Sequence, residues 1–406
     1  MKARWQIKTI GEVCEVINGG TPKTGVASYW DGPHQWITPA EMGKRCTPYI
    51  QETSRTLSDL GLQNSSATPL PAHSVILSSR APIGHIVINT VPMATNQGCK
   101  GLVPSRQVEY KFLYHYLSSI VDLLNDLGTG ATFKELSGGK LKEVKIPVPP
   151  LPDQQRIVAI LDQAFAGIAT ARANAEKNLQ NARALFESGN LAVFNKFITE
   201  GYQRTTVFDV AKPIKGSIRT GPFGSQLLHS EFVDKGIAVL GIDNAVNNEF
   251  RWDRRRYITL EKYKQLSRYQ VKPGDVLITI MGTCGRCAIV PDDIPTAINT
   301  KHLCCITLDT KKCIPAFLHC YFLHHPKAKQ FLADRVKGSI MAGLNMGIIS
   351  ELPILLPSLK YQQYIVEEID HLRTETQHLE SIYQQKLAAL AALKKSLLDQ
   401  AFTGQL

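Results

Sequence analysis

The stretch IPVPPLPDQQRIVAILD, residues 146–162, returns as ILLPSLKYQQYIVEEID at residues 354–370. Each copy has the pattern of a strand end, a proline break and a helix start, because proline cannot supply the N–H that a strand or helix interior needs. One copy would be an ordinary junction. Two copies in the same order, each followed by a long helical pattern, predict a chain built from two related halves.

An ungapped shift of 208 positions aligns residues 128–194 with residues 336–402. Identical pairs recur along the whole stretch and include Gln154/Gln362, Ile157/Ile365, Asp162/Asp370, Leu185/Leu393 and Phe194/Phe402. Upstream the match is looser: residues 73–88 resemble residues 274–290, with Gly84 on Gly285, and Asn96 falls on Asn299. The period is too long for a solenoid. It indicates a two-fold internal repeat, in which a shared asparagine favours a structural role over contact with a ligand.

The predicted fold class is α+β. Short Val/Ile/Thr runs separated by Gly and Pro predict two β-rich mixed domains, at residues 1–150 and 201–360. Helical segments occupy residues 151–200 and 361–406, with long helices expected over 153–195 and 361–402. Asp153 is a candidate N-cap for the first helix, and Ser358 is the nearest candidate for the second.

Apolar side chains in both helices recur at alternating spacings of four and three, which is typical of a coiled-coil seam. The seam positions are Ile157, Leu161, Ala164, Ile168, Ala171, Ala175, Ala182 and Leu185 in the first helix, and Ile365, Ile369, Leu372, Thr376, Leu379, Tyr383, Leu390, Leu393 and Leu397 in the second. Small residues opposite large ones favour pairing of the two helices, and a domain between them favours an antiparallel pair. Gly189 stands where the second copy has Leu397, which leaves the end of the first helix open.

The formal net charge is +11 and is unevenly distributed. Residues 201–360 carry 22 Lys and Arg against 13 Asp and Glu, and residues 1–150 carry 15 against 11, whereas the helical segments have no positive excess. Basic globular domains suit a polyanion such as DNA. A helix of about 40 residues is ~60 Å long, more than one turn of B-DNA, so paired helices could hold two DNA-contacting domains apart.

Signatures of catalysis and export are missing from the sequence. It contains no phosphate-loop motif, no dinucleotide-binding glycine motif and no Asn/Asp-Pro-Pro-aromatic tetrapeptide of an amino-methylating enzyme. Cys284 and Cys287 form a C-x-x-C, but the first copy has Ile83 and Ile86 there, which favours buried cysteines and no metal site. The nine cysteines are irregularly spaced, and no signal peptide or apolar membrane span is evident, so a cytoplasmic location is expected.

The whole chain resembles the specificity subunit of Type I restriction–modification systems. The resemblance rests on the order domain, helix, domain, helix, and on the phrases NGGTPKTGVASYWDG, APIGHIVI, ATNQGCKGLVP, IPVPPLPDQQRIVAILD and SLLDQAFTGQL. The second copy departs from the first where Pro152 and Asp153 become Lys360 and Tyr361.

That resemblance implies a non-catalytic subunit with two target recognition domains. Each domain would read one half of a bipartite, asymmetric DNA site, and the helices would set the unread spacer. The implied partners are double-stranded DNA, two modification (methyltransferase) subunits that methylate adenine, and ATP-driven restriction subunits that cleave DNA. S-adenosylmethionine, ATP and Mg would be used by those partners and not bound by this chain.

Candidate DNA contacts are polar residues of glycine-containing turns and arginine clusters, because such residues hold phosphates and read base edges. They are Thr21, Lys23, Thr24, Lys44, Arg45 and Arg80 in the first domain, and Arg219, Arg251, Arg254, Arg255, Arg256, Arg268 and Arg286 in the second. The Arg254–Arg256 cluster favours a phosphate clamp.

Two other classes of function remain open at this point. A coiled-coil scaffold with basic domains could bind protein or RNA instead of DNA. A fused modification–restriction enzyme could contain such a domain pair, but the repeat uses nearly every residue and leaves no room for a catalytic domain.

Overall fold

A computed structural model describes residues 5–45, 47–80, 82–130, 134–196, 202–252, 255–337 and 343–406. The chain divides into two compact units, which are described separately. The first unit comprises residues 1–176 and 385–406, and the second comprises residues 177–384. The two long helices, α7 (Leu151–Lys196) and α13 (Leu359–Thr403), each contribute one part to each unit. Their ends lie within two residues of those expected from the sequence.

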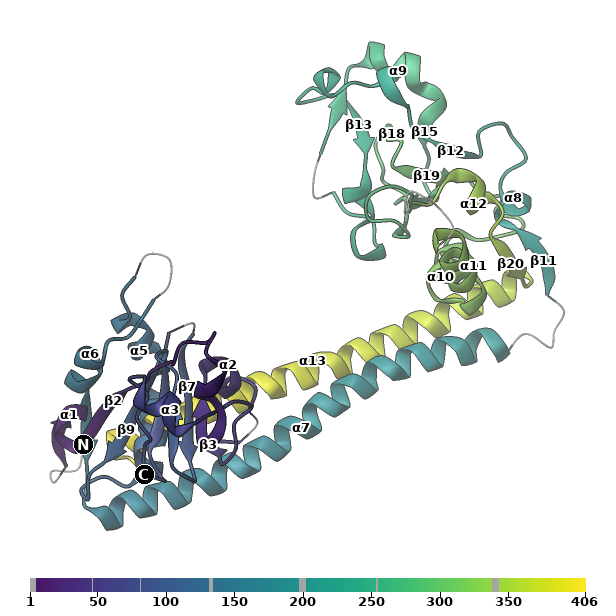
Figure 1. Cartoon of the computed structure of the whole chain (residues 1–406). Coiled ribbons are helices and arrows are strands. Elements are labelled where there is room, and N and C mark those ends of the chain that lie inside the picture. Colours follow the sequence, from purple (N-terminus) through teal and green to yellow (C-terminus); the bar gives the residue numbers. More distant parts are fainter. Residues whose placement is uncertain are drawn as a thin grey trace. The chain divides into compact units, whose positions relative to one another are not determined.

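The first unit is a mixed domain packed against parts of both long helices (Figure 1). Its strands are β1 (Gln6–Thr9), β2 (Cys14–Asn18), β3 (Trp30–Ile37), β4 (Tyr49–Ile50), β5 (Thr56–Leu57), β6 (Val75–Ser79), β7 (Ile83–Asn89), β8 (Met93–Thr95), β9 (Cys99–Pro104) and β10 (Lys145–Val148). Its helices before α7 are α1 (Ile10–Val13), η1 (Ala27–Tyr29), α2 (Pro39–Met42), α3 (Asp59–Gln63), α4 (Tyr110–Ser119), α5 (Val121–Leu127) and α6 (Gly138–Glu143).

Three sheets organise this unit. A five-stranded sheet has the order β2-β9-β6-β7-β4, a three-stranded sheet has the order β5-β3-β8, and β1 pairs with β10. Strand β6 alternates between two cores: Val75 and Leu77 face the helical core, whereas Ile76 faces the core under the three-stranded sheet. The five-stranded sheet is therefore buried on both faces.

The second unit repeats this plan. Its strands are β11 (Gln203–Thr206), β12 (Ile218–Thr220), β13 (Ile237–Leu240), β14 (Tyr257–Ile258), β15 (Gln270–Val271), β16 (Val276–Thr279), β17 (Cys287–Ile289), β18 (Ala297–Asn299), β19 (Leu303–Ile306) and β20 (Pro353–Leu356). Its helices before α13 are α8 (Val207–Val210), η3 (Gly224–Gln226), η4 (His229–Glu231), η5 (Ile242–Asn248), α9 (Leu260–Leu266), η6 (Ser267–Tyr269), α10 (Pro315–His324), α11 (Pro326–Lys337) and α12 (Met346–Ser350).

The sheet orders of the second unit are β12-β19-β16-β17 and β14-β13-β18-β15, and β11 pairs with β20. A parallel pair lies in the β5-β3-β8 sheet of the first unit, β3 with β8, and in the β14-β13-β18-β15 sheet of the second, β13 with β18. The two units thus share one plan, as the sequence repeat predicts, with β4 added at one edge in the first unit and β15 in the second.

One buried glutamine in each unit explains why the two quoted stretches resemble one another. In the first unit Gln154 Oε1 accepts a hydrogen bond from the Glu109 N–H, and its Nε2 donates to the carbonyls of Gln107 and Pro149. In the second unit Gln362 makes the same three bonds, to Ile314, Lys312 and Pro357. Both side chains are fully buried. The glutamine therefore attaches the start of each long helix to the domain that precedes it.

Replacing Gln154 by alanine leaves one buried N–H and two carbonyls without their partner, so we expect the first unit to lose about 2–3 kcal/mol of stability. Hydrogen exchange of amides in β6 and β9 measures this loss within the first unit. Gln155→Ala is the matched control, because Gln155 is exposed on the next position of the same helix. Equal effects of the two substitutions would contradict the role of Gln154.

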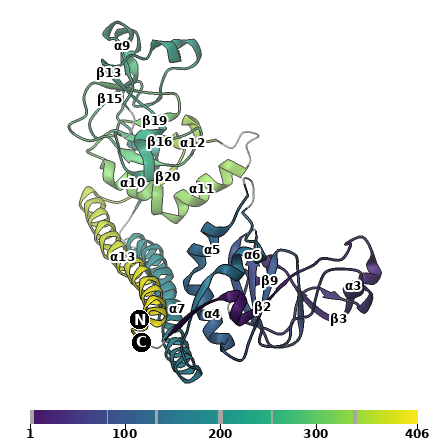
Figure 2. The same ribbon diagram turned by 90° about the vertical axis from the view of Figure 1, so that its left-hand side faces the viewer.

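Within each unit the segments of α7 and α13 run antiparallel, side by side in both views (Figure 1 and Figure 2). In the second unit Arg183 pairs with Glu380 at 3.0 Å, and Lys196, further along α7, donates to Tyr364 at 3.0 Å, earlier in α13. In the first unit Arg156 donates to the carbonyl of Leu406 at 3.0 Å. These contacts confirm the predicted antiparallel pairing inside each unit.

Small residues on α7 receive large ones from α13. A Cβ atom added to Gly189 would lie 2.4 Å from Cδ2 of Leu372, so the Leu372 side chain packs directly against the glycine. Ala175 and Ala182 are likewise buried. The helix does not end at Gly189 but continues to Lys196.

Two of the predicted seam residues were wrong. Leu185 and Leu393 are exposed, with 49% and 47% of their surface accessible. A straight helix has 3.6 residues per turn, so a strict seven-residue pattern drifts by ~20° per heptad. In α7 the buried face therefore moves from Ala182 to the half-buried Phe186 and the buried Asn190, and Leu185 turns outward. The other predicted seam residues are buried or half-buried.

The helix starts also differ from one prediction. Helix α7 begins at Leu151, and the Pro150 carbonyl accepts hydrogen bonds from the Asp153 and Gln154 N–H groups. Asp153 therefore lies inside the first turn, where its charge favours the helix dipole, and does not cap it. Ser358 directly precedes α13, as expected.

None of the helices in the described ranges is both long and apolar enough to cross a bilayer.

The core of the second unit contains a neutral histidine. His325 is 6% exposed, stacks on Tyr321 with ring centroids 4.2 Å apart, and meets Phe194 edge-on. Burial, with a smaller contribution from Lys327, lowers its pKa to about 4. The unfolded chain binds this proton at about pH 6.5, so stability falls as the pH drops from there toward 4.

At pH 5 we expect His325 alone to cost the second unit about 2 kcal/mol relative to pH 7. His325→Phe keeps an aromatic ring in place and should reduce the slope of stability between pH 4 and 6.5, leaving the part due to His324, whose pKa burial also lowers to about 4. Urea unfolding followed by hydrogen exchange of α10 at several pH values measures the slope. His378→Gln, at an exposed position of α13, is the control and should leave it unchanged.

Candidate nucleic-acid interface

The glycine-rich loop after β2 holds the first group of predicted contacts. Gly19 has no room for a side chain, because a Cβ atom there would lie 2.0 Å from the Asn96 carbonyl. Thr21 hydrogen-bonds to the same segment: its hydroxyl donates to Gln97 Oε1 and accepts from Asn96 Nδ2 at 2.8 Å. Lys23 and Thr24, further out on the loop, are exposed. The loop can therefore expose the Lys23 ammonium group and the Thr24 hydroxyl, while the hydrogen bonds of Thr21 hold the start of the loop in place.

A second group lies on the turn after α2. Lys44 and Arg45 are exposed there. The turn contacts the start of the β7 segment, since a Cβ atom on Gly43 would lie 2.7 Å from Nε2 of His85. Arg80, at the end of β6, pairs with Glu135 at 3.4 Å and is 37% exposed. Its charge is partly neutralised, so Lys44 and Arg45 are the stronger candidates.

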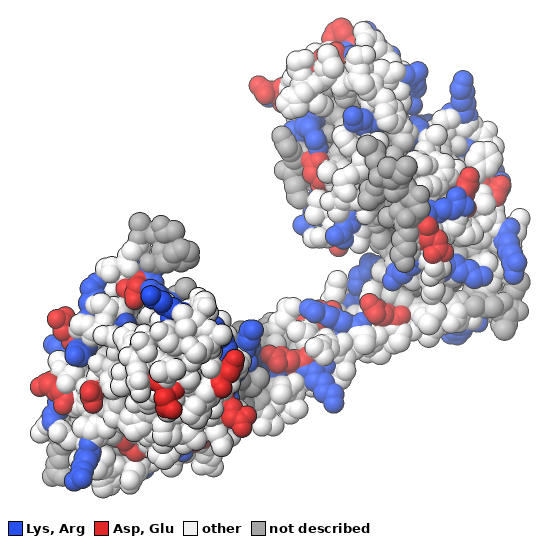
Figure 3. All heavy atoms as spheres, viewed as in Figure 1, with Lys and Arg blue, Asp and Glu red and all other residues white. Residues whose placement is uncertain are grey.

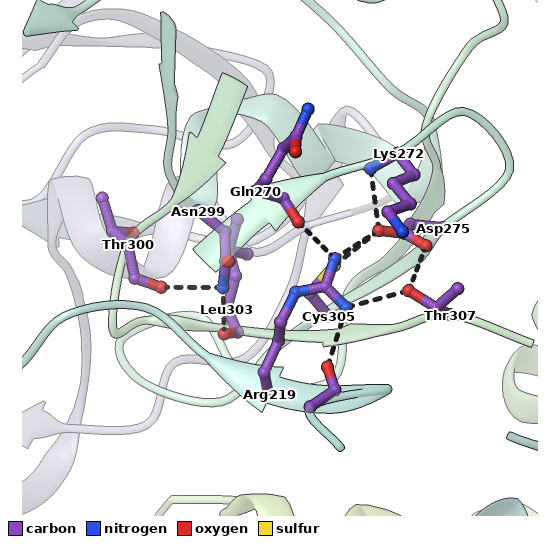
Figure 4. Close-up of polar contacts among 10 residues, drawn as sticks. Arg219, Gln270, Lys272, Asp275, Asn299, Thr300, Leu303, Cys305 and Thr307 are labelled. Atoms are coloured by element: carbon purple, nitrogen blue, oxygen red, sulfur yellow. Dashed lines mark hydrogen bonds and ion pairs between the residues drawn. The ribbon is translucent and has the colours of Figure 1, made fainter. Parts of the chain in front are cut away.

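Arg219 is not a DNA contact, and that prediction was wrong. Its side chain is 9% exposed and lies inside the second unit, against Asp275, which is 1% exposed (Figure 4). The Nη2 atom donates to Asp275 at 2.6 Å and to the Gln270 carbonyl at 2.6 Å. The Nη1 atom donates to Thr307 at 2.8 Å and to the Gly216 carbonyl at 3.2 Å.

Asp275 is fully committed to this cluster. Its carboxylate also accepts from the Thr307 hydroxyl at 2.6 Å, the Lys272 N–H at 2.9 Å and the Cys305 thiol at 3.2 Å. A buried charge pair is tolerated when most of its donors and acceptors are satisfied in this way, and in this pair Arg219 Nε is the buried atom without a partner among the described residues. Arg219 therefore supports the fold of the second unit.

The arginines around residue 255 are largely engaged with their neighbours. Arg256 forms an ion pair with Asp243, and Arg251 pairs with Glu249 at 3.4 Å. Arg255 lies over the Trp252 ring at 5.7 Å and is exposed. Arg254 lies outside the described residues. Arg268, exposed in η6, covers the Tyr269 ring at 4.7 Å. Arg255 and Arg268 keep accessible charge, and the phosphate-clamp role stays a prediction.

Arg286 remains an exposed candidate, on the turn between β16 and β17. That turn contacts η5, because the Cys287 N–H donates to Asn248 Oδ1 at 3.2 Å. The adjacent exposed Asn247 was not among the predicted contacts. An alignment of Lys44 and Arg45 with the second copy would have pointed to it. Lysines and arginines lie over the faces of both units seen in Figure 3, interleaved with acidic residues.

The cysteines of the second unit belong to its cores. Cys287, Cys304 and Cys305 are buried, and burial raises the pKa of each thiol. Within the part of the chain that the structure describes, no three His, Cys, Asp or Glu side chains gather as a metal site requires.

The aligned asparagines are not equivalent in the structure. In the parallel strand pair of the second unit, Asn299 lies opposite Leu240. At the equivalent place in the first unit, Ile37 lies opposite Thr95, not Asn96. Asn299 is fully buried and donates to the Leu303 carbonyl at 3.0 Å. Both asparagines bond within the fold, as expected, but from neighbouring positions.

Comparison with known proteins places this architecture. The family model of the Type I restriction modification DNA specificity domain matches residues 2–179 and 229–388. The chain belongs to this family. The two matched segments correspond to the two domains and include large parts of the long helices, so the repeat in sequence is a repeat of the family's domain.

Curated relatives carry the same description. A 159-residue segment is 36% identical to the Type I restriction enzyme MjaIX specificity subunit of Methanocaldococcus jannaschii, covering 39% of this chain and 37% of that protein. Over 333 residues the chain is 28% identical to the Type I restriction enzyme EcoBI specificity subunit of Escherichia coli, covering 78% of this chain and 70% of the relative. The first relative is therefore matched over less than half its length.

Solved structures share the fold. A chain of a type I R-M system, solved in a study of complex assembly and conformational transition, matches with a TM-score of 0.77 and 18% identity, covering 100% of this chain and 99% of that one. The HsdS subunit from Thermoanaerobacter tengcongensis matches with a TM-score of 0.63 and 17% identity, covering 100% and 98%.

Proposed function

We propose that this chain is the non-catalytic DNA specificity subunit of a Type I restriction–modification complex. Each unit reads one half of a bipartite, asymmetric site, and the two long helices set the length of the unread spacer. Modification subunits bound to the chain methylate adenine within the site, and ATP-driven restriction subunits cleave DNA that lacks this methylation. S-adenosylmethionine, ATP and Mg belong to these partners. Because the ligand is chromosomal and invading DNA, we infer that the chain acts in the cytoplasm.

The observation that carries this proposal is one topology used twice with different exposed side chains. The buried glutamine that anchors each long helix is the same in both units, Gln154 in the first and Gln362 in the second. The segment that follows β3 in the first unit carries Lys44 and Arg45, and the segment that follows β13 in the second carries Asn247 and Asn248. Two copies that keep the support and change the exposed turn suit the recognition of two unlike half-sites.

Methylation-site mapping of genomic DNA, in cells with and without this gene, tests the proposal. We expect one bipartite motif, with two unlike halves and a gap of constant length, to lose its methylated adenines when the gene is deleted. A methylation pattern that does not change on deletion would contradict the proposed function.

Leu185 and Leu393, which the heptad pattern assigned to the seam but which are exposed, support the docking of two modification subunits. Ala184, Leu185 and Ser188 on α7 are identical to Ala392, Leu393 and Ser396 on α13, and all six are exposed. Residues that neither unit uses in its own core, yet are the same in both copies, suit two copies of one partner. We therefore infer that each triplet contacts one modification subunit.

Leu185→Asp should remove one of the two modification subunits, because it places a charge in an apolar contact, and Leu393→Asp should remove the other. The double variant should bind neither. Native mass spectrometry of the reconstituted complex counts the subunits directly. Ala173→Asp and Ala388→Asp, at exposed positions elsewhere on the same helices, are matched controls and should keep both. Loss of both subunits from either single variant would contradict independent docking.

A further inference from the structure

Two turns of the second unit are fixed to one another. One is the end of η5, and the other joins β16 to β17. Asn248 Oδ1 accepts from the Cys287 N–H at 3.2 Å. His319, on α10, brings Nε2 to 2.9 Å from the Asn248 carbonyl and 3.1 Å from the Cys287 carbonyl. A buried helix thus holds both turns at one place.

The first turn has an unusual backbone. Asn247 and Asn248 have φ values of 55° and 64°, in the left-handed region that asparagine adopts more readily than other non-glycine residues. The Asn248 side chain is engaged in the hydrogen bond from the Cys287 N–H. Asn247 is exposed, and its amide has no hydrogen-bond partner among the residues that the structure describes. Two consecutive left-handed residues in a fixed turn, one with an exposed polar side chain, motivate a search for a function.

The neighbours of Asn247 complete a recognition surface. Arg286 directly precedes Cys287, so its backbone lies next to the asparagine turn, and its side chain is exposed. Ile242 and Met281 are each 38% exposed, and a Cβ atom on Gly282 would lie 3.7 Å from Ile242. An amide, a guanidinium and apolar groups on two fixed turns are the groups that read base edges and thymine methyls in DNA.

The first unit uses the same two turns with other side chains. The Glu41 N–H bonds to the Thr38 carbonyl as the Asn244 N–H bonds to the Gly241 carbonyl. Counting onward from these bonds places Lys44 and Arg45 at the positions of Asn247 and Asn248.

The second turn is equivalent as well. Val87 pairs with Ile76 as Ala288 pairs with Leu277, which makes His85 the counterpart of Arg286. This place therefore carries Lys44, Arg45 and His85 in the first unit. In the second unit it carries Asn247, Asn248 and Arg286.

We propose that Asn247 and Arg286 read adjacent base pairs of one half-site, Asn247 contacting an adenine and Arg286 a guanine. This assignment rests on the proposed function. Asparagine pairs in bidentate fashion with the N6 and N7 atoms of adenine, and arginine with the O6 and N7 atoms of guanine. Because Asn248 and His319 fix the turn, Asn247 loses little freedom on binding, which favours selectivity.

Asn247→Gly is the decisive variant. Glycine adopts a φ of 55° without cost, so the turn keeps its conformation while the amide is removed. Methylation mapping with the complete complex should show one adenine position of one half-site becoming permissive, and the other half-site unchanged. A bidentate contact is worth ~1–3 kcal/mol, so preference at that position should fall about 5- to 150-fold.

Arg286→Ala should relax a neighbouring guanine position of the same half-site. Arg204→Ala, at an exposed arginine on β11, is the control and should leave the motif as it is. Hydrogen exchange of β16 and β17 verifies that the variants keep the fold.

An unchanged motif for Asn247→Gly, in cells where deletion of the gene abolishes methylation, would overturn the assignment and leave the proposed function standing. Uniform weakening at all positions by Arg286→Ala would make it a phosphate contact and overturn its part. Methylation that survives deletion of the gene would instead defeat the proposed function itself.

Discussion

Arg219→Met should lower the free energy of unfolding of the second unit by about 3–5 kcal/mol, because removing one partner of a buried ion pair leaves the other charge uncompensated. Asp275 would remain 1% exposed with a negative charge. Thr307 and the Gln270 carbonyl would also lose a donor. Hydrogen exchange of the β16 and β19 amides in the whole chain measures the loss without interference from the first unit.

The first unit supplies a matched replacement for the entire cluster. Ile17 pairs with Gly101 as Arg219 pairs with Cys305, and counting along the paired strands makes Ser74 the counterpart of Asp275 and Val103 that of Thr307. The triple variant Arg219→Ile, Asp275→Ser, Thr307→Val therefore installs a set of side chains that this topology already uses.

We expect the triple variant to recover most of the stability that Arg219→Met loses, since well-packed neutral residues often replace a buried ion pair without cost. It should also keep the methylation motif of the wild-type chain. A motif that changes in one half-site, in a triple variant with normal hydrogen exchange, would contradict the structural role of Arg219 and return it to the DNA-contacting residues.

The difference between local sequence signals and contacts between distant residues explains what could and could not be predicted from the sequence. The repeat, the two long helices and their antiparallel pairing follow from periodicity and from the two quoted stretches, which are local signals. Arg219 looks like any turn arginine in the sequence, and its partner Asp275 lies 56 positions away. The direction of its side chain is set by strand pairing that a single sequence does not reveal.

Two smaller errors have equally definite causes. Leu185 and Leu393 follow the heptad pattern by type, but the drift of a straight helix turns them to solvent. Identity at Asn96 and Asn299 suggested equivalence, whereas the strand register equates Asn299 with Thr95. In both cases geometry, which sequence identity does not encode, decided the outcome. The exposed candidates Lys23, Thr24, Lys44, Arg45 and Arg286 remain predictions.

Lengthening both long helices by seven residues should change the gap of the DNA site and leave both half-sites intact. The insertions belong after Glu176 in α7 and after Gln384 in α13, where the chain passes between the two units. Each unit then keeps its own helix segments and contacts, including the Arg183–Glu380 pair. Seven residues nearly complete two turns, so the buried faces stay in phase to within ~20°.

Seven helical residues add about 10 Å, the length of about three base pairs of B-DNA. We therefore expect the methylation motif to gain about three unread positions between two unchanged halves, and methylation at the original spacing to fall to background. A seven-residue insertion in α7 alone is the control, because it shifts one helix against the other and should abolish methylation at either spacing. A double insertion that methylates the original motif as before would show that the helices do not set the gap.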